Sequence, residues 1–83
     1  MNGPSSLNEA VIHSLERYFH DLEGTQPAAI YEMVIQAVER PMLEVVMRDA
    51  HGNQLRASEM LGITRNTLRK KLQMHGMLRE MRR

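Results

Sequence analysis

A group of basic side chains in the C-terminal third of the chain has the spacing needed to bind a polyanion. Arg65 and Arg69 are four residues apart and Lys70 follows directly, so the three share one side of a helix. Cationic side chains neutralise phosphates, and an arginine can donate two hydrogen bonds to O6 and N7 of a guanine. An arginine at the start of a helix opposes the helix dipole, which favours a functional role for Arg65. The pattern predicts contact with duplex DNA.

Polar residues beside this group extend the candidate surface. Asn53 and Thr64 are typical helix N-caps, and a helix N-terminus also suits a phosphate. Arg56 could clamp a phosphate or pair with Glu59 or Glu80. The complete set of candidate DNA contacts is Asn53, Gln54, Arg56, Thr64, Arg65, Thr67, Arg69, Lys70 and Lys71.

The sequence leaves the roles of Thr67 and Lys71 open. Thr67 bonds either a phosphate or its own helix carbonyl, and Lys71 lies nearer the packed side beside Leu72. His51 and His75 lie close to the basic residues and gain charge below neutral pH, which would strengthen binding to a polyanion.

Two short helices joined by a turn must position these residues. Residues 54–61 and 65–75 carry apolar side chains three and four apart, which form one packed face on each helix. These side chains are Ala57, Met60, Leu61, Leu68 and Leu72. Gly62 supplies left-handed backbone for the reversal over residues 62–64, and Ile63 fills the corner. The sequence predicts a helix-turn-helix whose basic second helix fits the DNA major groove.

Two longer helices are predicted before this motif, over residues 7–22 and 28–49. The second is apolar around most of its girth, which one partner helix of so short a chain cannot cover. We therefore expect the helices of two copies to form an intertwined dimer core. Pro41 should kink this helix or break it in two. The predicted dimer interface consists of Val11, Ile12, Leu15, Phe19, Ile30, Val34, Val38, Pro41 and Val45.

Length and charge agree with this organisation. A chain of 83 residues forms one small domain, and chains of this size often gain stability by forming oligomers. Residues 1–49 carry three basic and eight acidic side chains, net −5, whereas residues 50–83 carry eight basic and two acidic, net +6. We expect a disordered segment over 1–6, dimerisation helices over 7–51, a DNA-binding unit over 52–77 and a basic tail over 78–83.

The sequence suggests a cytoplasmic protein without enzymatic chemistry. It contains no cysteine, no secretory signal and no apolar run long enough to span a membrane, so no membrane contact is expected. His13, Glu16 and His20 could converge on a metal ion, but a structural zinc site takes four ligands and no fourth is evident. No nucleophile–base pair or carboxylate pair is placed for catalysis. We therefore expect neither an enzyme nor a cofactor.

The run GNQLRASEMLGITRNTLRKKL, residues 52–72, resembles the factor for inversion stimulation (Fis) family of bacterial nucleoid-associated proteins. The resemblance covers residues 7–77 and includes Tyr18-Phe19, Gly24, Tyr31-Glu32, Pro41 and Gly76-Met77. It implies an all-α homodimer of four-helix chains, with a kink at Pro41 instead of a break. It also implies bending of AT-rich, degenerate DNA sites, with roles in nucleoid organisation and transcription regulation and with RNA polymerase as a candidate partner.

The chain departs from the family in several positions. Six residues before Leu7 are too few for the N-terminal arm that contacts recombinases, which puts a recombinase partner in doubt. Thr64 replaces a base-contacting asparagine, and Gln73 and Met74 replace lysines that contact flanking phosphates.

Two alternative functions stay open. The first is the C-terminal DNA-binding module of nitrogen-regulator-type enhancer-binding proteins, although this chain begins at its own Met1 without an upstream ATPase domain. The second is a helical interaction module that binds an acidic protein or RNA.

Overall fold

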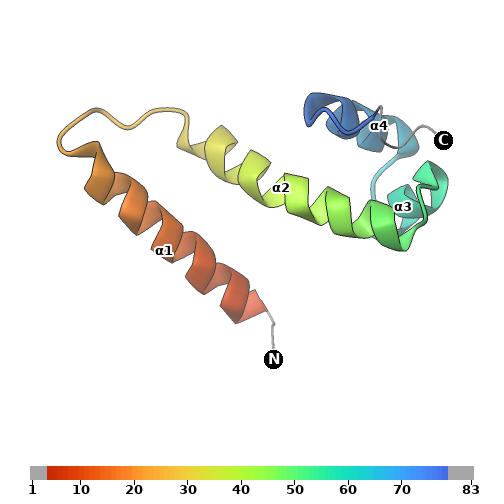
Figure 1. Cartoon of the computed structure of the whole chain (residues 1–83), viewed down its shortest axis with the longest axis horizontal. Coiled ribbons are helices and arrows are strands. Elements are labelled where there is room, and N and C mark those ends of the chain that lie inside the picture. The colour runs from red at the N-terminus through yellow and green to blue at the C-terminus, as the bar shows by residue number, and fades with distance from the viewer. Residues whose placement is uncertain (1–3, 79–83) are drawn as a thin grey trace. The chain divides into compact units, whose positions relative to one another are not determined.

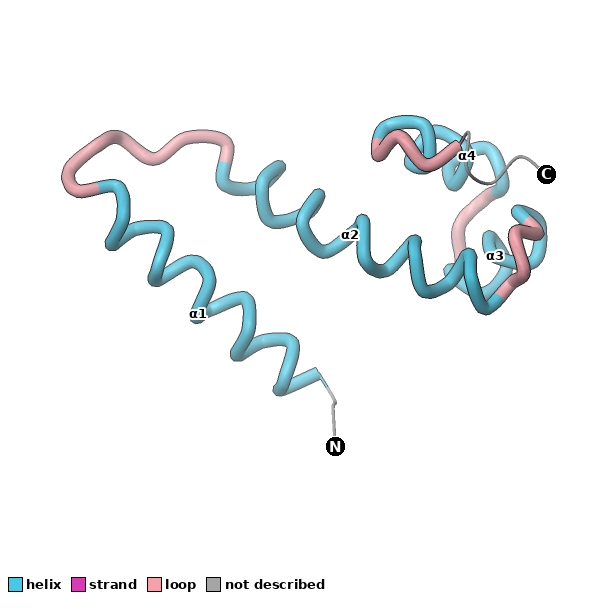
Figure 2. Tube along the Cα trace, in the orientation of Figure 1, coloured by secondary structure: helices cyan, strands magenta, loops and turns pink. Residues whose placement is uncertain are grey.

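The computed structural model describes residues 4–78, which form four helices and no strand (Figure 1, Figure 2). The helices are α1 (Pro4–Leu22), α2 (Ile30–Asp49), α3 (Gln54–Leu61) and α4 (Arg65–Met74). This confirms the predicted all-α class with four helices. The start of the predicted disordered segment and most of the basic tail, residues 1–3 and 79–83, lie outside the described residues. No helix in the described part is long and apolar enough to cross a membrane.

The first helix begins three residues before its predicted start at Leu7. Residues 4–6, which the sequence analysis placed in a disordered segment, form the first turn of α1 in this structure. Proline is favoured in a first helical turn because its missing N–H would have no partner there. Further along α1, the rings of Tyr18 and Phe19 meet edge to face at a centroid distance of 5.5 Å.

The second helix starts at Ile30, two residues after its predicted start. Ala29 has left-handed backbone (φ 54°), and its carbonyl accepts the first bond of the helix from the Met33 amide at 3.0 Å. The helix then runs unbroken through Pro41 (Figure 1), so the alternative of two separate helices is wrong. Pro41 and Ala37 are both exposed, and water can therefore bond the Ala37 carbonyl that the proline leaves unpaired.

The chain divides into two compact units, one ending at Ile35 and the other beginning at Gln36. The buried core of the second unit combines α2, α3, α4 and the segment after α4, and its members are Leu43, Met47, Ala50, Ala57, Leu68, Leu72 and Met77. The C-terminal half of α2 therefore supports the helix-turn-helix, although the sequence assigned this helix to dimerisation alone. The physical reason is that α3 and α4 are too short to bury their own apolar faces.

Local capping sets the bounds of the helix-turn-helix. The Asn53 side chain accepts a hydrogen bond from the Arg56 amide at 3.1 Å and starts α3. Gly62, with φ 78°, ends α3, and its amide donates to the Ser58 carbonyl at 2.9 Å. Ile63 packs against the core from the turn, as predicted. Residues 54–61 and 65–74 are thus helical, and α4 ends at Met74, one residue before its predicted end at His75, which is the C-cap.

Gly62→Ala should destabilise the second unit by about 1–2 kcal/mol, because an alanine Cβ is strained in left-handed backbone. No atom lies within 4 Å of the added Cβ, so the strain comes from the backbone alone. Urea unfolding followed by circular dichroism measures the change. Glu59→Ala, at an exposed position of α3, is the control, and equal stability of the two variants would contradict the assignment.

Candidate nucleic-acid interface

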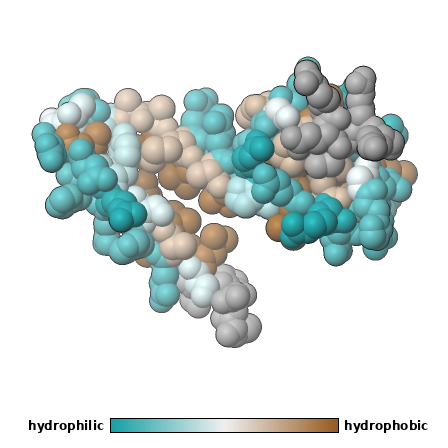
Figure 3. Space-filling view, in the orientation of Figure 1, coloured by the Kyte–Doolittle hydropathy of each residue, from teal (hydrophilic) through white to brown (hydrophobic). Residues whose placement is uncertain are grey.

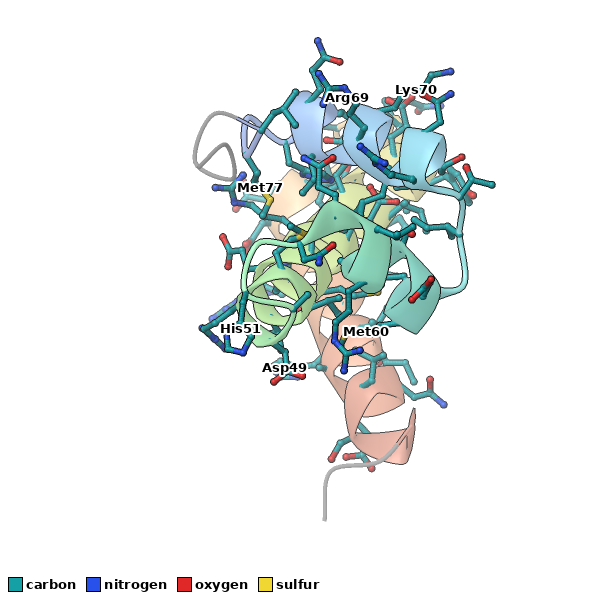
Figure 4. The ribbon with its side chains drawn as sticks, turned by 90° about the vertical axis from the view of Figure 1, so that its right-hand side faces the viewer. Asp49, His51, Met60, Arg69, Lys70 and Met77 are labelled. Atoms are coloured by element: carbon teal, nitrogen blue, oxygen red, sulfur yellow. The ribbon has the colours of Figure 1, made fainter. Side chains whose placement is uncertain are left out.

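The outer face of α4 carries three exposed cations. Arg65, Arg69 and Lys70 are all exposed, whereas Leu68 and Leu72 of the same helix are fully buried. Figure 4 shows Arg69 and Lys70 extending outward from α4. No carboxylate among the described residues forms an ion pair with any of the three. Their charges are therefore available to an external anion.

The first turn of α4 is fixed by two threonines. The Thr64 hydroxyl oxygen accepts a hydrogen bond from the Thr67 amide at 3.1 Å, which confirms Thr64 as the N-cap. The Thr64 hydroxyl also donates to the Thr67 hydroxyl oxygen at 2.9 Å, and the described residues show no bond from the Thr67 hydroxyl to a carbonyl of its own helix. Asn66, exposed between Arg65 and Thr67, is a polar group that the sequence analysis did not include. This cap holds the backbone from which Arg65 projects.

The start of α3 adds a second polar group. Asn53 and Arg56 are exposed, and Gln54 is half-buried. Arg56 forms no ion pair with Glu59 in the described part of the chain, and Glu80 lies outside it. Arg56 is thus not paired with Glu59, the one of its two alternative partners that lies in the described part of the chain.

A buried carboxylate connects α2 to the packed side of α4. Glu39 is only 8% exposed, and its Oε2 atom lies 2.5 Å from the Lys71 ammonium. Its Oε1 atom lies 2.9 Å from Nε2 of His75, and the neighbouring Arg40 donates a hydrogen bond to the His75 carbonyl. The hydrogen bond from Lys71 lowers the pKa of Glu39, burial opposes the shift, and the bond with His75 adds to it.

This cluster changes the interpretation of Lys71, which the sequence placed in the DNA-binding set. Its ammonium is directed toward Glu39 because the side chain leaves α4 on the side of Leu72. His75 was expected to strengthen binding to a polyanion, whereas its side chain is only 7% exposed and lies against Glu39. A signal was present in the sequence: Glu39, Leu43 and Met47 recur every four residues and form one buried stripe.

The metal-site alternative has no support in the geometry. Among the described side chains, no group of three histidine, aspartate or glutamate residues could hold a metal ion, and this includes His13, Glu16 and His20. His20 instead contacts Asp21, with 3.4 Å between Nδ1 and Oδ1.

Apolar side chains of α1 and α2 stay open to solvent in the single chain. None of the nine predicted dimer residues is buried. Ile12, Phe19 and Val45 are 55%, 50% and 52% exposed, respectively. Figure 3 shows hydrophobic surface along both helices.

Glu39→Gln should lower the free energy of unfolding at pH 7 by about 1–3 kcal/mol, because the hydrogen bonds lose their charge. The folded pKa of Glu39 is lowered, so its stabilisation is complete above the ordinary value of 4.5 and is lost as the pH falls through the folded value. Urea unfolding at several pH values should show wild type and variant converging in acid. Glu59→Gln, at an exposed position without an ion pair among the described residues, is the control. A pH-independent difference between wild type and Glu39→Gln would contradict the ionised pair.

Comparison with known proteins agrees with this geometry. A family model described as "Bacterial regulatory protein, Fis family" matches residues 34–75. A protein of Ralstonia nicotianae, named as a Fis-like DNA-binding protein, is 53% identical over 72 residues, which cover 87% of this chain and 94% of the relative. A protein of the same name from Neisseria meningitidis serogroup A is 51% identical over 72 residues, which cover 87% of this chain and 91% of the relative. The chain belongs to the Fis family of bacterial regulatory proteins.

Proposed function

We propose that this chain binds and bends duplex DNA as a homodimer and acts in nucleoid organisation and transcription regulation. The observation that supports this most directly is the group of exposed cations on α4, which have no ion-pair partner in the described part of the chain, on a capped helix-turn-helix. The relatives from Ralstonia and Neisseria carry DNA binding in their names, which agrees with it. A protein with this role works in the cytoplasm on the chromosome, and RNA polymerase is a candidate partner at promoters.

In this proposal α4 lies in the major groove with its first turn toward the bases. Arg65 donates two hydrogen bonds to a guanine edge, while Arg69 and Lys70 bind phosphates along the groove. Asn53 and Arg56, at the start of α3, contact the phosphate backbone beside it. A single arginine that reads a base edge, surrounded by phosphate contacts, gives sequence-tolerant binding.

The cost of deforming the DNA supplies the sequence preference that the base contact of Arg65 does not provide. When the two recognition helices of a dimer lie closer together than one DNA turn, about 34 Å, straight DNA cannot reach both. The duplex must bend, and the cost of bending depends on its sequence. This accounts for a preference for AT-rich, degenerate sites without further base contacts.

The exposed apolar side chains of α1 and α2 support the proposed dimer. The nine exposed or half-buried side chains listed in the sequence analysis would be covered by the same surface of a second copy. Burial of Ile12, Phe19 and Val45 removes the largest exposed groups among them. The acidic N-terminal half then forms the dimer core, and the two basic halves face the DNA.

Arg65→Ala should weaken binding to a good site by about 1–3 kcal/mol, because one bidentate contact is lost. Fluorescence anisotropy of a labelled AT-rich duplex across a salt series measures it. Arg17→Ala, at an exposed position of α1, removes the same charge away from the proposed interface and should leave affinity unchanged. Binding that is weak and indifferent to salt and to Arg65 would favour the helical interaction module instead.

Val45→Asp should shift the protein from dimer to monomer, because a carboxylate would be buried in the apolar interface. Sedimentation equilibrium at micromolar concentrations measures the shift. Leu55→Asp is a matched control, since Leu55 is 53% exposed on α3, outside the proposed interface. A monomeric wild type, or a variant as dimeric as wild type, would refute the interface.

A further inference from the structure

We propose that Glu39 is a positioning residue for DNA recognition, and that Lys71 acts through Glu39 instead of through a phosphate. Glu39 would fix the rotation of α4 about its own axis, and with it the direction of Arg65. This inference rests on the proposed function, in which α4 enters the major groove.

The contacts of Glu39 are suited to fixing a rotation. Its two carboxylate oxygens each bond a different residue of the α4 segment, at 2.5 Å to Lys71 and 2.9 Å to His75. These partners are four residues apart, so the carboxylate bonds two successive turns at once. Arg40 adds a third link through its bond to the His75 carbonyl. Apolar side chains can slide past one another, whereas hydrogen bonds are directional.

The same geometry keeps Lys71 from binding DNA. The Glu39 side chain is 10% exposed, so withdrawing Lys71 toward a phosphate would leave a carboxylate buried with His75 alone. Leaving a buried charge without its counter-charge is strongly unfavourable. Lys70, the preceding residue, has the same chemistry but is exposed and without a carboxylate partner among the described residues. Two adjacent lysines therefore have different tasks.

A small rotation of α4 would matter for recognition. Cα atoms lie about 2.3 Å from the helix axis, so a rotation of about 20° moves them by about 0.8 Å. The guanidinium of Arg65 lies farther from the axis and moves correspondingly more. A bidentate contact with a guanine requires both hydrogen bonds to stay aligned, so loss of the Glu39 contacts should reduce discrimination between bases before it reduces phosphate binding.

The test measures salt dependence and base discrimination in the full chain. Anisotropy titrations use two duplexes that differ only at the guanine of the preferred site. Lys70→Met should lower the slope of log affinity against log salt by about 0.9, the value for one lost phosphate contact. Lys71→Met should leave the slope unchanged. Both Glu39→Gln and Lys71→Met should reduce the affinity ratio of the two duplexes at least about fivefold, the lower range for one bidentate contact.

The control and the double variant separate positioning from folding. Exposed Glu32→Gln, also on α2 and without an ion pair among the described residues, should keep the wild-type ratio. Glu39→Gln with Lys71→Met should lose no more discrimination than either change alone, because both act on one link. Measurements are made at temperatures where circular dichroism shows each variant folded. If Glu39→Gln does not fold, the salt slope and the affinity ratio of Lys71→Met decide the test.

Three results would overturn the inference. A slope that falls for Lys71→Met as it does for Lys70→Met would place Lys71 on a phosphate. An unchanged affinity ratio in folded Glu39→Gln or Lys71→Met would leave Glu39 a purely structural role. A wild type without a salt slope, or a Lys70→Met variant with the wild-type slope, would instead refute the proposed function itself, and the inference with it.

Discussion

The helix-turn-helix depends on one buried stripe of α2. Glu39, Leu43 and Met47 lie along this stripe, and the leucine and methionine supply the core that α3 and α4 cover. Helices of eight and ten residues are unstable in isolation, so their packing on α2 is what makes them form. The same helix carries Val38 and Val45 on a face that its own chain does not bury. One side of α2 thus packs in the core of the helix-turn-helix unit, and another side contributes to the proposed dimer interface.

The distribution of charge follows from this arrangement. The cations of α4 that face outward have no partner among the described residues, whereas Lys71, on the packed side, is neutralised by Glu39. An exposed basic face costs nothing in desolvation and is ready for phosphates, while an unpaired lysine on the packed side would be expensive. The position of each cation on α4 therefore decides whether it can bind a ligand. Three can, and Lys71 cannot.

The sequence predicts well those features that depend on neighbouring residues. Asn53, Gly62 and Thr64 act within one turn of their own positions, and they fix residues 54–61 and the turn after them as predicted. The link from Glu39 to Lys71 joins residues 32 apart, and no local pattern identifies such a partner. The four-residue spacing of the stripe can be found in the sequence once the structure is known, but it does not show that a carboxylate in the stripe would be paired. The packing of α2 against α3 and α4 was not predicted either, because those helices come later in the chain and no local pattern of α2 identifies them.

DNA binding through α4 is tested most directly by titrating the ¹⁵N-labelled chain with an AT-rich duplex and following the amide chemical shifts. We expect shift changes to concentrate on residues 65–70 and 53–56, with α1 little affected. Shift changes concentrated on the acidic α1, or none at all under low salt, would contradict it.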